Sequence, residues 1–391
     1  IPHAVGYALA DKMRGERAIS VAFFGDGAMQ IGTAYEAMNL AALYTTPTVF
    51  VVENNQYAVS THVSEQTRET RLSLRGLGLG IPSITFDGMD VIAARRAMET
   101  ARKIIETSGG PVLLEARTYR HLHQSGPLKG SAFGYRDKAE EDAWLARDPA
   151  TTLPQQILQA GLLTEAQIDT LRSRAIAAVD DTLDRLIEGS GKDRRLKPDL
   201  WPDPATVEYG IRGDLSELAD KRHLEERDLT AETGVEAKFH DVISEVMLRN
   251  METFDGLFVL GEDVHRLRGG TAGATLNGAR PVVEIMYPDF SLVAADQLFN
   301  QIAKVRHMFG GDFPVPVVVR SRVTQGTGYD SQHSMDASGL FTLYPGWRVV
   351  APSTPHDYIG LMNAAIACDD PVLVVEYNEL FQNKGQVPTS D

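Results

Sequence analysis

Short runs of apolar residues alternate with segments of helical spacing through the first third of the chain. The apolar runs lie at residues 20–24, 48–53 and 112–116, and the helical segments at residues 33–43 and 91–106. Strands of a parallel sheet are buried on both faces and therefore read as continuous apolar runs. The pattern predicts that residues 1 to about 120 form one α/β unit, a mostly parallel sheet with helices on both faces.

The spacing of apolar residues becomes helical from Asp137 to Leu186. Thr164 stands three positions before Gln167, which is the arrangement of a capping box, so the last long helix is predicted to start there. We expect this helical tail to pack on a sheet edge or on a neighbouring subunit.

A change of composition separates this region from the rest of the chain. Between Gly189 and Glu232, glycine, proline and closely spaced charges replace the periodic pattern, which is typical of a linker. A second α/β unit is predicted after it, opening with an amphipathic helix at residues 235–251. Its expected strands are residues 257–260, 281–286, 315–320, 347–351 and 372–376, with helices at residues 292–309 and 356–367.

Composition narrows the class of protein. Hydrophobic residues make up 43% and charged residues 23%, as in ordinary globular proteins. The net charge of −15 argues against general nucleic-acid binding. The single cysteine, Cys368, excludes an internal disulfide and is predicted to be a small buried hydrophobe, which fits a cytoplasmic protein. No apolar run is long enough to span a membrane, and the start at Ile1 suggests a piece of a longer protein.

Two polar motifs follow two of the predicted strands. Gly25-Asp26-Gly27 ends the first apolar run, and Asn54-Asn55 ends the second. A carboxylate and a carboxamide at the carboxyl ends of neighbouring parallel strands can share one hard cation, which leaves room for phosphate oxygens. Glycines let peptide N–H groups approach an anion. Each motif alone is more often a simple turn, but together they indicate a magnesium-diphosphate clamp.

The sequence around these motifs resembles the α subunit of the thiamin-diphosphate-dependent decarboxylase component of 2-oxo acid dehydrogenase complexes. The resemblance is to the branched-chain, pyruvate or acetoin type of this enzyme. The second half resembles the β subunit of the same enzyme. The segments that carry the resemblance are residues 25–28, 36–41, 53–61, 87–90 and 118–120 for the α subunit, and residues 260–264, 280–284, 289–290, 331–334 and 350–355 for the β subunit. An α-then-β order in one polypeptide implies a fused enzyme.

The resemblance implies a division of the chain and a set of site residues. Residues 1–188 would be the module that binds diphosphate and magnesium, residues 189–232 the linker, and residues 233–391 the pyrimidine-binding module without the C-terminal β-subunit domain. Mg²⁺ would be held by Asp26, Asn55 and the carbonyl of Tyr57. Thiamin diphosphate would be bound by Gly25, Asp26, Gly27, Ala28, Asn55 and Phe290, with Phe290 against the aminopyrimidine ring.

Two histidines are the catalytic candidates that the resemblance implies. His333 matches the β-subunit histidine over the thiazolium, and an imidazole can orient substrate or move a proton near neutral pH. The family's second histidine falls on Gln124 when counted without a gap, and a one-residue loop adjustment restores His123 to this role. Ser125 would correspond to a regulatory phosphorylation site.

Three parts of the family pattern are missing from this sequence. They are the N-terminal α portion, the C-terminal β domain and the segment between Val264 and Arg280, which in the family carries the glutamate that activates the cofactor. Glu262 and Glu284 lie in motifs of their own and do not replace it. We expect that segments of a longer protein are absent here, so that the numbering from Gly270 to Gly278 crosses an artificial join.

The implied function is oxidative decarboxylation of a 2-oxo acid with reductive acylation of a lipoyl group on a partner acyltransferase. The expected assembly is a homodimer of fused chains, with no nucleic-acid or membrane partner. Two alternatives remain open. One is an acetoin dehydrogenase component, which uses the same cofactor, and the other is a catalytically silent scaffold that binds thiamin diphosphate.

Overall fold

The computed structural model describes residues 1–201, 211–261, 278–324 and 331–389. The chain forms two compact units. The first contains Ile1 and residues 21–206, and the second contains residues 2–20 and 207–391. Helix α1 (Pro2–Met13) therefore belongs to the second unit, where Ala10 packs with Phe258, Leu260 and Ala279.

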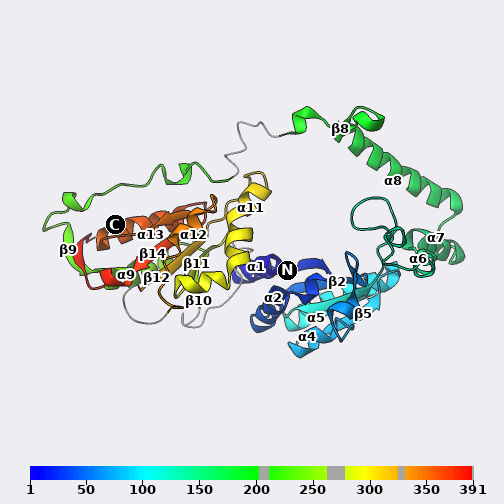
Figure 1. Ribbon diagram of the computed structural model, residues 1–391, viewed down its shortest axis with the longest axis horizontal. Helices are drawn as coiled ribbons and strands as arrows, with labels where there is room; N and C mark the ends of the chain where they lie inside the picture. The colour runs from blue at the N-terminus through cyan, green and yellow to red at the C-terminus, as the bar shows by residue number, and fades with distance from the viewer. Residues whose placement is uncertain (202–210, 262–277, 325–330, 390–391) are drawn as a thin grey trace. The chain divides into compact units, whose positions relative to one another are not determined.

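The first unit is built on a four-stranded sheet with the order β1-β2-β6-β5 (Figure 1). The sheet consists of β1 (Ser20–Gly25), β2 (Thr48–Asn54), β6 (Val112–Arg117) and β5 (Ser83–Asp87). The β2–β6 and β5–β6 pairs are parallel. Three of these strands were predicted. The sequence pattern missed β5 because Ser83-Ile84-Thr85-Phe86-Asp87 mixes polar and apolar residues.

Two predicted helices, α2 (Gly32–Leu43) and α5 (Val91–Ser108), belong to this unit. Helix α5 begins after Asp90, whose carboxylate accepts hydrogen bonds from the N–H groups of Ile92 and Ala93, and it ends at Gly109 with φ +73°. Its small residues Ala97 and Ala101 pack on strands β2 and β6. Shorter elements complete the core of the unit: η1 (Ala28–Gln30), β3 (Tyr57–Ala58), β4 (Thr61–His62), α3 (Val63–Gln66) and α4 (Leu74–Gly78).

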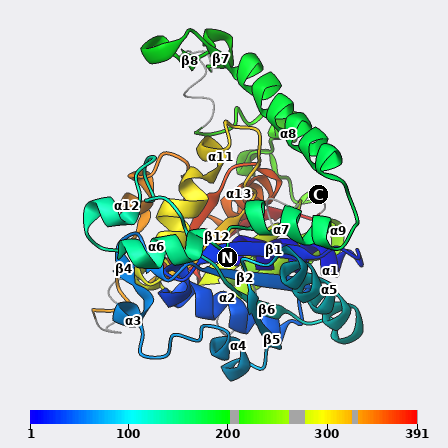
Figure 2. The same cartoon turned by 90° about the vertical axis from the view of Figure 1, so that its right-hand side faces the viewer.

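The predicted helical tail consists of α6 (Lys138–Leu145), α7 (Pro149–Gln159) and α8 (Glu165–Leu186). The capping box at Thr164 and Gln167 is confirmed. Helix α8 buries only Ile168, so most of its length does not pack on the sheet of its own unit (Figure 2), and packing on a neighbouring subunit stays a prediction. In the described part of the expected linker, the elements are short: β8 (Arg195–Leu196), which pairs with β7 (Ile187–Glu188), and brief 3-10 turns.

The second unit is a five-stranded parallel sheet with helices on both faces (Figure 1). Its strands, in spatial order, are β10 (Leu257–Gly261), β11 (Arg280–Ile285), β12 (Val318–Val323), β14 (Val372–Tyr377) and β13 (Arg348–Val350). Helices α9 (Phe239–Thr253) and α13 (Pro355–Ala367) share one apolar core with the sheet. Segments η9 (Asp296–Ile302), α11 (Ala303–Met308) and α12 (Ser338–Thr342) contribute to the other. The predicted fold class is confirmed.

Three predicted elements of this unit differ in the structure. Residues 234–238 are strand β9 (Gly234–Lys238), which pairs with β15 (Lys384–Pro388), and the helix starts only at Phe239. Strand β12 starts at Val318 instead of residue 315, because Pro316 has no N–H for the ladder. The predicted helix at residues 292–309 is broken into η8 (Pro288–Leu292), the π-helical segment η9 and α11. Cys368 is buried, as predicted.

Candidate functional site

The carboxylate of Asp26 is the central feature of the first unit. It lies directly after β1, only 1% of the residue is exposed, and neither carboxylate oxygen has a hydrogen-bond partner among the described residues. Burial raises the pKa of Asp26, and nearby Gln66, Arg120 and His62 partly oppose this shift. A buried carboxylate without a partner is costly. Its oxygens therefore fit a site for a cation.

The two glycines beside Asp26 have different roles. Gly25 closes β1, and a Cβ there would meet no atom within 4 Å. Gly27 precedes η1, which starts at Ala28, and has an ordinary right-handed φ of −63°. A Cβ on Gly27 would lie 2.7 Å from the Cβ of Ala58. Gly27 is therefore required by the close approach of the loop that carries Tyr57, and the two motifs meet in the structure.

The turn after β2 is held by side chains of its own. The Oδ1 atom of Asn55 accepts a hydrogen bond from the N–H of Tyr57 at 3.1 Å, and Gln56 adopts a left-handed φ of +71°. The preceding Asn54 donates through Nδ2 to Glu115 at 2.8 Å. Glu115 is fully buried and also accepts the N–H of Ser73 at 2.8 Å. This arrangement fixes the turn on which the expected oxygen ligands Asn55 and Tyr57 lie.

Tyr57 contacts Arg136 and Glu140, which lie far from it in the sequence. The guanidinium carbon of Arg136 lies 4.6 Å from the ring centre of Tyr57 and 4.6 Å from that of Tyr119. The Tyr57 hydroxyl donates to Glu140 at 3.1 Å, and burial, followed by Glu140, raises the pKa of Tyr57 to about 12. Arg136 is 5% exposed. Arg136 is therefore a buried cation in contact with both rings, and it joins the loop that carries Tyr57 to the segment that carries Tyr119.

His123 lies on the same network. Its Nδ1 atom is 2.9 Å from the hydroxyl of Tyr135, whose ring centre is 5.8 Å from that of Tyr57. The His123 ring also packs at 4.4 Å on Phe133. By contrast, Gln124 and Ser125 are exposed, and His121 lies 3.8 Å from a carboxylate oxygen of Asp148. Within this loop, the His123 ring contacts Tyr135, which in turn packs against Tyr57.

A cleft opens at the carboxyl ends of strands β2, β5 and β6, where ligands of α/β sheets bind. Its volume is about 770 Å³. The cleft borders the turn after β2 but its lining does not include Asp26 or Asn55. Its lining residues are Asn54, Gln56, His62, Val63, Ser64, Thr70, Thr85, Phe86, Asp87, Arg117, Trp144 and Arg147.

In the second unit, Phe290 and His333 come together around a third ring. His333 packs edge-on against Tyr287 at 4.6 Å and against Phe290 at 5.3 Å, measured between ring centres. The carbonyl of His333 accepts the Thr324 hydroxyl at 2.7 Å, and Asp289 accepts the N–H of Met335 at 3.1 Å. The loop that carries His333 is thus anchored on both sides of the histidine.

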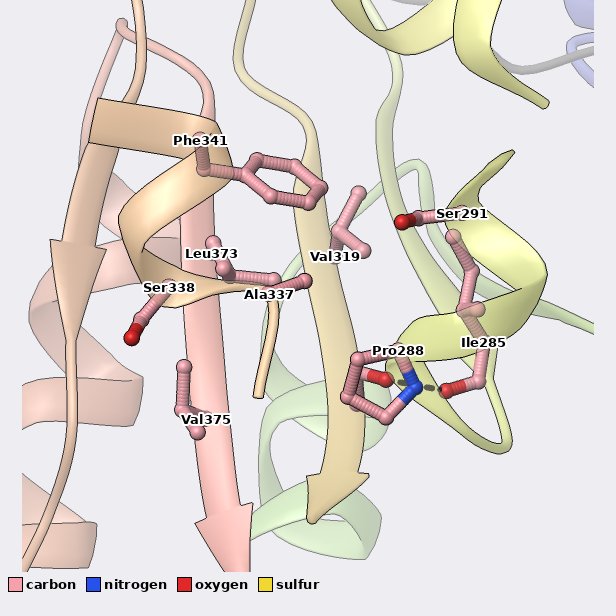
Figure 3. A pocket seen from close by; sticks show the side chains of 10 residues that line it. Ile285, Pro288, Ser291, Val319, Ala337, Ser338, Phe341, Leu373 and Val375 are labelled. Carbon is pink, nitrogen blue, oxygen red and sulfur yellow. Dashed lines mark hydrogen bonds between the residues drawn. The ribbon is translucent and has the colours of Figure 1, made fainter. Parts of the chain in front are cut away.

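A small cavity lies between the 3-10 turn η8, helix α12 and strands β11, β12 and β14 (Figure 3). Its volume is about 10 Å³, which is room for roughly one water molecule. Ser291 lies in its wall, and the Ser291 hydroxyl is buried without a partner among the described residues. This cavity is too small for a cofactor ring.

Several residues of these networks were not singled out from the sequence. They are Glu115, Arg136, Glu140 and Tyr287. Their partners are distant in the chain, for example 61 positions between Asn54 and Glu115 and 83 between Tyr57 and Glu140. The one available signal was Glu115 itself, a charge inside an apolar run. The expected segment with Glu262, and the residues from Gly270 to residue 277, lie outside the described residues.

Within the described ranges, no group of three or more histidine, cysteine, aspartate or glutamate side chains could hold a metal ion. The predicted magnesium ligands are a different kind of set, one carboxylate with amide and peptide oxygens. No helix in the part of the chain that the structure describes is long and apolar enough to cross a membrane.

Comparison with known proteins assigns both halves of the chain. Residues 1–188 match the family described as dehydrogenase E1 component, and residues 265–383 match the pyrimidine-binding domain of transketolase. Both are thiamin-diphosphate-binding families.

Individual relatives point the same way. A 3-methyl-2-oxobutanoate dehydrogenase subunit alpha of Mycobacterium tuberculosis is 38% identical over 176 residues, 44% of this chain and 47% of the relative. A pyruvate dehydrogenase E1 component subunit alpha of Zymomonas mobilis is 39% identical over 163 residues, 41% of this chain and 45% of the relative. An acetoin:2,6-dichlorophenolindophenol oxidoreductase subunit beta of Cupriavidus necator is 47% identical over 120 residues, 31% of this chain and 36% of the relative.

The chain spans about half the length, or less, of these curated relatives. The buried carboxylate after β1, the glycine that lets the next loop approach it, and the ring cluster of the second unit lie in the two matched regions. The chain therefore joins, in one polypeptide, a region similar to dehydrogenase E1 components and a region similar to the pyrimidine-binding domain of transketolase.

Proposed function

We propose that this protein carries out thiamin-diphosphate-dependent oxidative decarboxylation of a 2-oxo acid and transfers the acyl group to a lipoyl group of a partner acyltransferase. The observation that carries this proposal is Asp26, a buried carboxylate whose two oxygens have no partner among the described residues. Such a group fits Mg²⁺ better than it fits an empty protein interior.

The residues around Asp26 fit the cofactor as well as the ion. Mg²⁺ would be held by Asp26, the amide oxygen of Asn55 and the carbonyl of Tyr57, and the N–H groups of Gly27 and Ala28 would meet the diphosphate. Gly25 ends strand β1 directly before this turn. When bound, thiamin diphosphate supplies an electron sink for the loss of carbon dioxide.

The second unit would supply the remaining contacts. Phe290 offers an apolar face to the aminopyrimidine ring and excludes water there. His333 would orient the substrate or move a proton during acyl transfer, and His123 is the second proposed catalytic histidine. Functionally, residues 1–188 would be the diphosphate module, residues 189–232 the linker and residues 233–391 the pyrimidine module.

The proposal also covers assembly and location. We infer a homodimer of fused chains in which diphosphate and pyrimidine modules of different chains complete each site, as part of a cytoplasmic multienzyme complex with a lipoyl-bearing partner. The net charge of −15 supports a partner other than nucleic acid.

Acetoin cleavage is the second candidate function. The observation that favours it is the 47% identity over 120 residues to the acetoin oxidoreductase subunit beta, whereas the two other relatives named above are α subunits. That match is also shorter, at 120 residues. A silent scaffold that binds the cofactor without turnover is the remaining alternative.

The purified chain, supplied with Mg²⁺ and thiamin diphosphate, tests these functions with an artificial electron acceptor and with a lipoyl domain. We expect turnover of pyruvate or 3-methyl-2-oxobutanoate. Turnover of acetoin alone would favour the second candidate, and tight cofactor binding without any turnover would favour the scaffold. Asp26→Asn should abolish magnesium-dependent binding of the cofactor. Asp169→Asn, exposed on helix α8, is the control and should bind normally.

A further inference from the structure

Arg322 is an unusual cation near the end of strand β12. Its Nη2 atom donates to the hydroxyl of Tyr287 at 2.9 Å, and its guanidinium carbon lies 5.2 Å from the centre of that ring. The Nε atom is buried and has no hydrogen-bond partner among the described residues. The Nη2 atom is thus fixed by Tyr287, while the Nε–H group is left to donate to another acceptor.

The nearest carboxylates form their ion pairs with Arg320, and Arg322 acts on Glu284 only as a nearby charge. Glu376 accepts two hydrogen bonds from Arg320, at 2.8 and 3.1 Å. Glu284 lies 3.5 Å from Arg320, and burial raises the pKa of Glu284 to about 7, so this carboxyl group carries only part of a charge near neutral pH. Within the described ranges, Arg322 forms no ion pair with any carboxylate.

The ring that holds Arg322 also contacts His333. Tyr287 meets His333 edge-on at 4.6 Å, with an interplanar angle of 72°. The Thr324 hydroxyl, two residues after Arg322, donates to the carbonyl of His333. The guanidinium and the imidazole are therefore positioned by the same tyrosine and the same strand end.

We propose that Arg322 recognises the carboxylate of the 2-oxo acid substrate, an inference that rests on the proposed function of this site. A guanidinium fork matches a carboxylate, and a hydrogen bond between two charged groups is stronger than one between neutral groups. The substrate carboxylate leaves as neutral carbon dioxide, so the attraction exists in the bound substrate and fades as the bond breaks. Arg322 therefore selects the substrate and does not lower the barrier. Acetoin, which has no carboxylate, gains nothing from it.

Kinetics of Arg322→Gln test the proposal. We expect KM for pyruvate or 3-methyl-2-oxobutanoate to rise roughly tenfold to a hundredfold, as for loss of one charge-assisted contact, with kcat unchanged or higher. The KM for acetoin, where the enzyme accepts it, should not change. Arg322→Lys should recover part of the loss, and Tyr287→Phe should cause a smaller rise because it frees only the Nη2 arm. Arg249→Gln, on the outer face of α9, is the control and should behave as wild type.

Direct binding gives a second measurement that does not need turnover. Calorimetric titration of the cofactor-free chain with pyruvate should detect binding that weakens with salt and is lost in Arg322→Gln, while the melting temperature and thiamin diphosphate binding stay near wild type. Unchanged KM and unchanged pyruvate binding in Arg322→Gln would overturn the proposal, as would an equal loss with acetoin and 2-oxo acids. Absence of turnover in the wild type would reject the proposed function instead, and pyruvate binding would still decide the role of Arg322.

Discussion

At the scale of single residues, the buried carboxylate of Asp26 is unfavourable for the stability of the unit that carries it. Its buried carboxylate has no hydrogen-bond partner among the described residues, so in the absence of a cation it destabilises the unit that carries it. We expect Asp26→Asn to raise the free energy of unfolding of the cofactor-free protein by roughly 1 kcal/mol or more while it removes magnesium-dependent cofactor binding. Urea unfolding with and without Mg²⁺ and thiamin diphosphate measures both effects. A variant that is less stable than wild type without cofactor would contradict this reading.

The two glycines of the motif allow a matched comparison. A methyl group on Gly27 would lie 2.7 Å from the Cβ of Ala58, whereas one on Gly25 would meet nothing within 4 Å. We expect Gly27→Ala to cost about 1–3 kcal/mol, because the loop with Tyr57 must move, and Gly25→Ala to be close to neutral in stability. Thermal unfolding of the two variants measures this difference in stability. Equal losses of stability would show that the contact with Ala58 is not the reason for a glycine at position 27.

At the scale of elements, a buried ion network joins strands β11, β12 and β14 to helix α13. Arg320 lies between Glu284 and Glu376, and the Tyr358 hydroxyl donates to Glu376 at 2.6 Å. The carboxyl group of Glu284 is the member that titrates near neutrality, because burial raises its pKa from 4.5 to about 7.

The raised pKa of Glu284 makes the stability of the protein depend on pH in one direction. Between pH 4.5 and pH 7 the folded protein holds a proton on Glu284 that the unfolded chain has released, so stability falls as pH rises and the full loss is present above pH 7. Glu284→Gln does not titrate, so its stability relative to wild type should increase by up to about 3 kcal/mol between pH 5 and pH 8. Urea unfolding at the two pH values tests this. Glu245→Gln, exposed on α9, should show no such change, and a pH-independent difference for Glu284→Gln would refute the assignment.

The start of helix α8 is another local device. The Thr164 side chain accepts the N–H of Gln167, and the Gln167 side chain accepts the N–H of Thr164. Thr164→Ala should lower the stability of α8 by about 1 kcal/mol and increase amide exchange in its first turn. The exposed Thr170→Ala, in mid-helix, should be neutral or slightly stabilising because alanine has the higher helix propensity.

At the scale of the whole molecule, the proposed dimer predicts complementation between inactive chains. Asp26→Asn removes the metal ligand of one module, and His333→Ala removes the imidazole of the other. If each site combines modules of two chains, co-expression of the two variants should yield dimers with one intact site and restore roughly a quarter of wild-type turnover. Each variant expressed alone is the control. If each site forms within one chain, no activity should return.

The sequence determined much of the architecture because apolar periodicity is local. The runs that became β1, β2, β6, β10, β11 and β14 were visible as such, and so were helices α2, α5 and α13. Residues 235–238 were predicted as the start of a helix because their apolar positions continue the pattern of α9, but they form strand β9. Strand β12 was predicted to start too early because Pro316 lies inside an apolar run. Asp26 and Asn55 were found because glycine and amide residues after a strand form a recognisable motif.

Tertiary structure alone decided what surrounds those motifs. The contacts of Glu115 with Asn54, of Arg136 with Tyr57, and of Arg322 with Tyr287 join residues that no spacing relates. The family resemblance supplied the expected chemistry, but only the fold shows that the Asp26 carboxylate is buried without a partner and that Gly27 must be a glycine. The reason is physical: strand and helix periodicity follows from neighbours in the chain, whereas burial and charge pairing depend on segments brought together by folding.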